Sequence, residues 1–177
     1  MDAEASDDRT PRRHWYDYPA YLLLRWILCL IQSMEVERID RWCHLLGSLL
    51  AGPLKIKQRI VVENLKRVFP QWSPRQIDQT KLQMWVHLLR LFVEIALAKR
   101  KIHRSNWYEH FRVLDRRKLL AFFFDTRPKL IVTGHIGNFE IAGFMNGTFG
   151  LPSYTVAREL DNPYVFNYLN RFRTAGG

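Results

Sequence analysis

Cysteine is scarce in this chain of 177 residues, which has only Cys29 and Cys43. Two cysteines cannot build the disulfide framework of a small secreted domain. Neither has a second cysteine or a histidine at the spacing of a metal site, so we expect no bound metal. The sequence therefore predicts two buried thiols in a reducing compartment.

Acidic residues are also few, with 17 Asp and Glu against 27 Lys and Arg, and the formal net charge is +10. A basic balance indicates which partners are attracted and not which fold forms. Nucleic acid, an anionic membrane surface and an acidic or phosphorylated partner all suit this charge. No zinc-finger spacing and no aromatic RNA-binding signature is present, so we expect no nucleic-acid partner.

A long uninterrupted apolar run is missing as well. The run Ala20–Ile31 is broken by Arg25, and as a helix it would cover roughly 18 Å of the ~30 Å hydrocarbon core. Arg25 would cost about 3 kcal/mol at the centre of a bilayer. Four aromatic residues between Trp15 and Tyr21 suit the headgroup level. We therefore predict a disordered tail over residues 1–14 and a membrane-anchoring interfacial helix over residues 15–34. The alternative for the second segment is an ordinary buried helix.

The first part of the remaining chain is helical in pattern. Glu35–Leu50 and Pro53–Val68 are expected to be helices, the second ending before Pro70. Ser73, Pro74 and Gln76 form a strong helix start, with Ser73 as cap and Gln76 completing a capping box. Apolar residues recur at helical spacing from there to about Lys99.

The second part of the chain alternates between segments with the pattern of a strand and segments with the pattern of a helix. The predicted strands are Tyr108–Val113, Lys129–Thr133 and Ser153–Val156, the middle one being β-branched and bounded by Pro128 and Gly134. The predicted helices are Asp115–Phe124, Asn138–Asn146 and Asn162–Phe172. Such alternation predicts an α/β fold in which a helical N-terminal lead-in precedes a mostly parallel sheet. Residues 35–177 are expected to form part of a single domain.

A histidine and a glutamate stand where this predicted sheet would bind ligands. His135 follows the predicted strand, and Glu140 lies in the first turns of the next helix. On one continuous helix the two would point about 140° apart. A turn at Gly137 would bring them together, and Asn138 would cap the helix.

A carboxylate beside an imidazole stabilises the protonated ring, so the pair suits general-base chemistry. No serine or cysteine occupies a nucleophile elbow, so the attacking group would be a substrate hydroxyl deprotonated by His135. The amides at the helix start after Gly137 would face developing negative charge. Spacing alone leaves a structural histidine as the alternative.

Three segments resemble one known family. Thr133–Glu140 resembles the His-x4-acid motif of the lysophospholipid (glycerolipid) acyltransferase superfamily, and its Gly-Asn-aromatic-Glu ending is similar to bacterial lipid A late acyltransferases of the lauroyl or myristoyl type. Glu63–Pro70, followed by Trp72 and Ser73, resembles that family's Asn-Leu…Phe-Pro…Ser segment. Ala157–Pro163 resembles its Arg-Pro-x-Asp-Asn-Pro segment. The resemblance covers the chain from about Trp15.

The resemblance implies an O-acyltransferase that moves a fatty acyl chain from acyl carrier protein or coenzyme A to a hydroxyl of a glycolipid such as a lipid A precursor. It implies no cofactor beyond that co-substrate, and a place on the cytoplasmic face of the inner membrane. His135 matches the family's base and Glu140 its partner. Arg158 and Arg173, with Arg171 as second choice, match arginines that the family uses to bind substrate. Gly137 and Asn138, within the motif, are also expected to contribute to substrate binding. Guanidinium groups suit phosphate or carbonyl oxygens; the alternative is a solvated basic helix face.

Two features depart from the family pattern. Glu159 replaces the proline that often follows the first arginine, which affects the shape of that loop. The chain stops at Gly177, where the family continues with further strands and helices. We therefore expect a C-terminally truncated fragment with an incomplete sheet, inactive or poorly folded alone.

Two other functions stay open at this point. One is acylation of a phosphatidylinositol mannoside or another polar lipid, which these residues do not distinguish from acylation of a lipid A precursor. The other is an inactive membrane-surface binding module, which the basic charge and the aromatic N-terminal segment favour.

Overall fold

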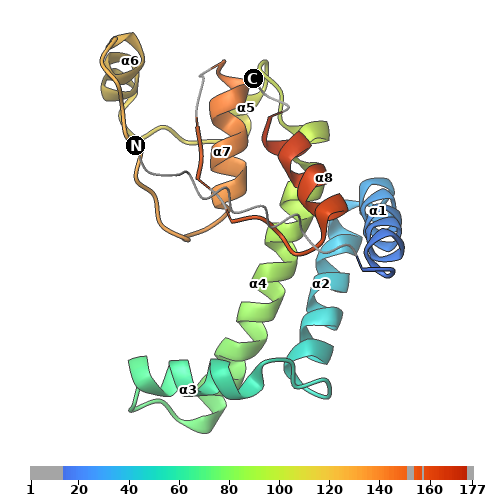
Figure 1. The fold of residues 1–177 in the computed structure, drawn as a ribbon. Coiled ribbons are helices and arrows are strands. Elements are labelled where there is room, and N and C mark those ends of the chain that lie inside the picture. Colours follow the sequence, from blue (N-terminus) through green and yellow to red (C-terminus); the bar gives the residue numbers. More distant parts are fainter. Residues whose placement is uncertain (1–13, 151–153, 157, 175–177) are drawn as a thin grey trace, which may run out of the picture. The chain divides into compact units, whose positions relative to one another are not determined.

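The computed structural model describes residues 14–150, 154–156 and 158–174, and helices make up most of them (Figure 1). These residues group into two compact units. The first unit comprises the described residues among 1–29 and 139–177, and the second comprises residues 30–138. The predicted tail over residues 1–14 lies, except for His14, outside the described residues.

The second unit is built on two long helices, α2 (Val36–Ala51) and α4 (Pro74–Lys101), which pack side by side. Ile39 and Cys43 on α2 meet Val86 and Leu97 on α4 in its buried core. At Gly47 a Cβ atom would lie 2.6 Å from Val86 Cγ2, so only glycine permits this close approach of the helices. The core of this unit is therefore an interface between helices.

Two of the predicted helix starts of the second unit, those at Ser73 and Asp115, are confirmed. Ser73 caps α4 and shares a full capping box with Gln76. Asp115 caps α6 (Arg116–Phe124) by accepting a hydrogen bond from the Lys118 amide. The helix expected from Pro53 begins later, as α3 (Gln58–Val68), because the backbone turns through left-handed conformations at Lys55 and Lys57.

The first unit contains α7 (Phe139–Thr148), α8 (Pro163–Arg173) and α1 (Asp17–Ser33) up to Cys29. Phe144 and Phe172 stack with their ring centroids 5.1 Å apart, which joins α7 to α8. Asn162 caps α8 through its side-chain oxygen and donates its amide to the Asp17 carbonyl at 2.8 Å. One side chain thus both starts α8 and ties it to α1.

Arg25, whose charge disfavours a transmembrane position for this helix, has specific partners within the first unit. Its guanidinium donates to the Tyr21 hydroxyl at 3.2 Å and lies 5.3 Å from the centroid of the Tyr168 ring. The hydrogen bond that Arg25 donates to Tyr21 is the main reason that the pKa of Arg25 is raised. Arg25 therefore attaches α1 to α8 through an aromatic surface.

The predicted α/β fold is wrong for the part of the chain that the structure describes, which is all helical and contains no strand. Trp107–His110 forms the short helix α5 where a strand was expected, and residues 111–113 are irregular. Lys129–Thr133 and Tyr154–Val156 are irregular and exposed; Ser153 lies outside the described residues. A strand needs a neighbour for its backbone N–H and C=O groups, and among the described residues neither segment has one.

The structure also tests the predictions about the two cysteines and about a membrane-spanning helix. Cys43 is buried as expected, and burial raises the pKa of its thiol, but Cys29 is exposed, so the prediction of two buried thiols is wrong for Cys29. Within the described ranges, no helix is both long and apolar enough to cross a bilayer.

Candidate functional site

His135 lies in a loop, residues 125–138, which connects α6 to α7. The middle of this loop is exposed, and Leu130, Val132 and Ile136 each keep 84–89% of their surface accessible. His135 is exposed at a bend between Gly134 and Ile136. An exposed imidazole on an irregular loop is accessible to a substrate without any rearrangement of a core.

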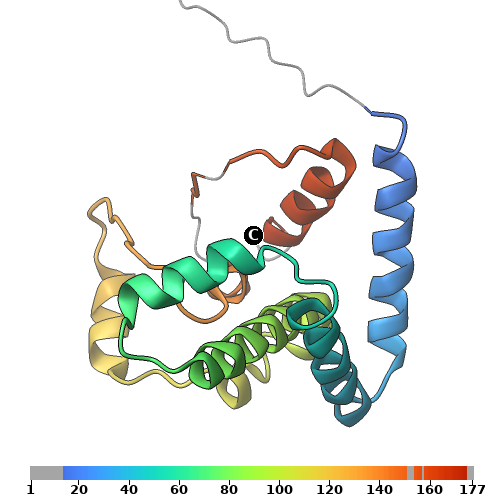
Figure 2. The ribbon, with the colours of Figure 1, turned by 90° about the horizontal axis from the view of Figure 1, so that it is seen from below.

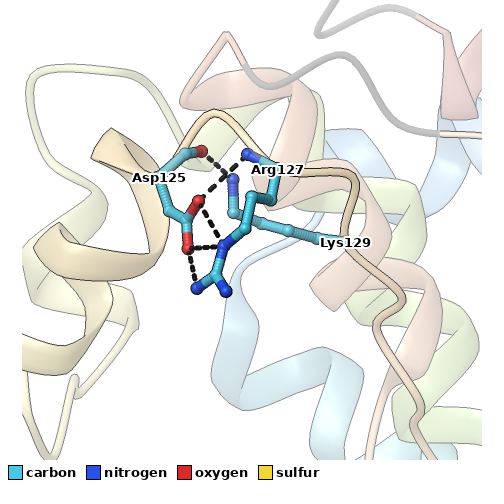
Figure 3. Close-up of polar contacts among 3 residues, drawn as sticks. All are labelled: Asp125, Arg127 and Lys129. Carbon is cyan, nitrogen blue, oxygen red and sulfur yellow. Dashed lines mark hydrogen bonds and ion pairs between the residues drawn. The ribbon is translucent and has the colours of Figure 1, made fainter.

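The loop is fixed at its start by Asp125, the residue that ends α6 (Figure 3). The Arg127 guanidinium donates to both Asp125 carboxylate oxygens, with an Nη2–Oδ2 distance of 2.7 Å, and the Arg127 amide donates to Oδ1. Lys129 donates to the Asp125 carbonyl. The hydrogen bond from Arg127 lowers the pKa of Asp125, because it favours the carboxylate form.

The loop is fixed at its end by Asn138. The amide nitrogen of Asn138 donates to the Leu91 carbonyl at 3.0 Å and to Glu94 Oε2 at 2.9 Å, both on α4. Sequence reasoning named Asn138 but missed Glu94. The available signal was that Glu94 is the only charged residue in the apolar stretch Leu91–Ala98.

Gly137 supports the turn that the sequence predicts there. Its φ is +63°, a left-handed conformation that residues with a Cβ rarely adopt. A Cβ atom would nevertheless meet nothing within 4 Å. The requirement for glycine at this position therefore comes from the backbone conformation and not from crowding.

Glu140 is held by Arg173. Glu140 lies in the first turn of α7, and Arg173 in the last turn of α8. Arg173 Nε donates to Glu140 Oε2 at 2.9 Å, and Arg173 Nη2 donates to Oε1. The two side chains are 13% and 27% exposed for Glu140 and Arg173, respectively. The hydrogen bond to Glu140 raises the pKa of Arg173, which therefore stays charged.

The structure thus pairs Glu140, the predicted partner of the base, with Arg173, a predicted substrate-binding residue. His135 falls in the second unit and Glu140 in the first. The two other arginines lie elsewhere in the first unit. Arg171 is exposed in the last turn of α8. Arg158 is 91% exposed on the irregular segment before α8, 3.9 Å from Asp161.

The Asp161–Asn162–Pro163 segment has a clear local function. Asn162 Oδ1 accepts hydrogen bonds from the amides of Tyr164 and Val165, and Pro163 occupies the first turn of α8. The segment therefore sets the start of the helix whose last turn carries Arg173. Among the described residues, no group of three or more His, Cys, Asp or Glu side chains is arranged to hold a metal ion.

Comparison with known proteins agrees with the motifs. The model of the family described as bacterial lipid A biosynthesis acyltransferase matches residues 9–177, which include the three segments quoted above. No curated protein and no solved structure gave a significant match. The resemblance predicted from the sequence is thereby confirmed, and the chain belongs to the bacterial lipid A biosynthesis acyltransferase family.

Proposed function

We propose that this protein is an O-acyltransferase that moves a fatty acyl chain from an acyl thioester to a hydroxyl of a lipid A precursor. The observation that supports it best is the position of the motif acid within a family match over residues 9–177. Glu140 lies in the first turn of α7, five residues after His135, and is held by Arg173 from α8. The motif glutamate is present and is anchored by an ion pair, which favours a catalytically competent motif.

In the proposed reaction, His135 removes the proton from the acceptor hydroxyl. The alkoxide oxygen attacks the thioester carbonyl, and a bond forms between that oxygen and the acyl carbon. The carbon–sulfur bond then breaks, and the departing thiolate takes the proton from the His135 imidazolium. The products are an ester and a thiol, with no acyl-enzyme. This chemistry needs no metal or organic cofactor.

Glu140 would stabilise the imidazolium that forms on His135. A carboxylate has about four lone-pair sites, and Arg173 occupies one on each oxygen. The remaining sites can accept a hydrogen bond from the imidazole. Arg173 is then a positioning residue for Glu140, which changes its expected role from direct substrate binding.

The exposed Arg158 and Arg171 retain the role of binding phosphate or carbonyl oxygens of the substrates. A net charge of +10 suits both an acidic carrier protein and a phosphorylated glycolipid. Acyl carrier protein is therefore our expected donor, with coenzyme A as the alternative carrier of the same thioester.

We also propose that α1 holds the protein at the cytoplasmic face of the inner membrane. Leu22, Leu23, Trp26, Ile27 and Leu30 are all exposed, and at 100° per residue they share one face of α1. Arg25 and Tyr21 lie on the opposite face, where they contact α8. An exposed apolar face with a tryptophan suits an interfacial helix.

The test is acyl transfer to a lipid A precursor by the purified protein, with acyl carrier protein or coenzyme A as the carrier. Because a general base contributes about 10²–10⁴-fold, His135→Ala should lower the rate by that factor. His87→Ala, an exposed histidine on α4, is the matched control and should keep the rate. Transfer that persists in His135→Ala would remove His135 from the mechanism. A folded protein that binds vesicles but transfers nothing would favour the membrane-binding module.

A further inference from the structure

Helix α2 has a second apolar face besides the one in the core. The packed face carries Ile39, Cys43, Gly47 and Ala51, at intervals of four residues. The second face carries Trp42, Leu45, Leu46 and Leu49, which are 42–51% exposed. At 100° per residue, the centres of the two faces lie about 130° apart around the helix. The second face is therefore not covered by α4.

The exposed apolar surface continues past the end of α2. Leu54 is 60% exposed and Ile60, in the first turn of α3, is 57% exposed. Hydrogen bonds from the Leu54 amide to the Leu49 carbonyl (3.1 Å) and from the Ile56 amide to the Leu50 carbonyl fold this linker back onto α2. We call this surface, formed by Trp42, Leu45, Leu46, Leu49, Leu54, Ile56 and Ile60, the α2–α3 corner.

The α2–α3 corner lies at one end of the pair formed by α2 and α4. Figure 1 shows α3 running across the end at which α4 begins, and both figures show the linker from α2 leading into α3 (Figures 1 and 2). All of these residues belong to the second unit. The corner is therefore a surface of that unit alone, and its geometry does not depend on α1.

The segment that carries the second half of this surface is rich in cations. Residues 52–68 contain five basic residues, Lys55, Lys57, Arg59, Lys66 and Arg67, against the single acid Glu63. Glu63 is paired with Arg59 at 2.8 Å, so it does not neutralise the other four. Lys55 and Lys57 alternate with Leu54 and Ile56, and both lysines are exposed. They also adopt positive φ angles of 47° and 48°, which residues other than glycine rarely do.

We propose that the α2–α3 corner is a second docking surface, and that its partner is the surface of an anionic lipid bilayer. Exposed leucines and a tryptophan suit the boundary between headgroups and acyl chains, and the lysines that alternate with Leu54 and Ile56 suit lipid phosphates. A protein partner with a purely apolar surface would leave these cations unpaired. An anionic bilayer offers acyl chains to the apolar side chains and phosphates to the lysines. The proposal rests on the family's lipid substrate and not on the proposed base or acyl donor.

The test measures binding of the full chain to vesicles of phosphatidylcholine with one quarter phosphatidylglycerol. The variant Lys55→Gln/Lys57→Gln should bind about tenfold more weakly, because each cation near an anionic surface contributes severalfold to partitioning. Arg116→Gln/Arg117→Gln is the matched control, since it removes two exposed cations from α6 of the same unit. Added salt should weaken binding of the parent chain more than binding of the lysine variant.

A second pair of variants tests the apolar part. Leu45→Ser/Leu49→Ser should also weaken vesicle binding. Leu114→Ser/Leu120→Ser, at two leucines elsewhere in the unit that are at least as exposed, should not. Hydrogen exchange should slow in peptides over residues 45–60 when vesicles are added. Protection confined to residues 17–33 would overturn the proposal, and so would a self-association of the chain that both α2–α3 variants abolish. Acyl transfer by His135→Ala fails or persists independently of this binding, so the two proposals are separately testable.

Discussion

Arg173 and Glu140 form a two-pronged ion pair between the last turn of α8 and the first turn of α7. The pair is 33 residues apart in sequence and lies beside the stacked Phe144 and Phe172 rings of the same two helices. Because both side chains are mostly buried, each neutralises a charge that would otherwise be costly there. The motif acid is therefore anchored by a residue outside its own motif.

Arg173→Ala should destabilise the α7–α8 pair by about 1–3 kcal/mol, because it removes two charge-assisted hydrogen bonds. Arg173→Lys should lie between, since it keeps the charge but not the planar fork. Hydrogen exchange of residues 139–148 measures the effect. Arg158→Ala is the control, because that side chain is 91% exposed.

A double-mutant cycle separates this pair from a general effect of charge. If Glu140 and Arg173 are coupled as the structure shows, Glu140→Gln/Arg173→Ala costs less than the sum of the two single changes. Additive costs would mean that the ion pair contributes nothing to holding α7. Acyl transfer should fall in Arg173→Ala even at temperatures where the protein stays folded, because Glu140 would no longer be positioned.

The helices could be predicted from the sequence because their signals are local. Ser73, Pro74 and Gln76 lie within one turn, and each makes the contact that its position predicts. The strand over Lys129–Thr133 was predicted from an apolar, β-branched run, which is also local. A strand is completed only by a distant partner, and no local pattern shows whether one is present. The pattern was therefore sufficient for the helices and insufficient for the sheet.

The candidate site divides in the same way. His135 and Glu140 were recognised from their spacing and from the resemblance. The pairing of Glu140 with Arg173 was not predicted, because it joins two helices that are distant in sequence. Glu94 was missed because its partner, Asn138, is 44 residues away. Residue identities near the site were thus predictable, and their partners across helices were not.

Asn138→Asp should release the end of the 125–138 loop from α4. The change places a second carboxylate where the amide now lies 2.9 Å from Glu94, which costs about 1–2 kcal/mol through repulsion and a lost hydrogen bond. Hydrogen exchange of residues 129–138 should become faster. Glu94→Gln in the same chain should partly reverse the effect, because an amide again faces a carboxylate. If Glu94→Gln leaves the fast exchange unchanged, the bond to Glu94 does not hold the loop.

The start of the same loop should respond to acid. The pKa of Asp125 is lowered by the Arg127 hydrogen bond, so the folded turn favours the carboxylate. Its stabilising effect is complete above the ordinary aspartate pKa and is lost as the pH falls through the lowered pKa. The backbone amide resonance of Arg127 should report this titration. In Arg127→Gln the midpoint should move upward; an unchanged midpoint would show that Arg127 does not cause the shift.

Asn162 should be sensitive to replacement in a way that separates its two contacts. Asn162→Ala removes the cap of α8 and the bond to the Asp17 carbonyl, and we expect a loss of about 2–3 kcal/mol for the two together. Asn162→Asp keeps an oxygen for the Tyr164 and Val165 amides but has no donor for Asp17. Exchange of those two amides should stay slow in Asn162→Asp, while the contact between the Tyr18 and Tyr164 rings, 5.3 Å apart, should weaken in nuclear Overhauser measurements. Equal loss of both signals in the two variants would mean that capping and attachment to α1 form one inseparable interaction.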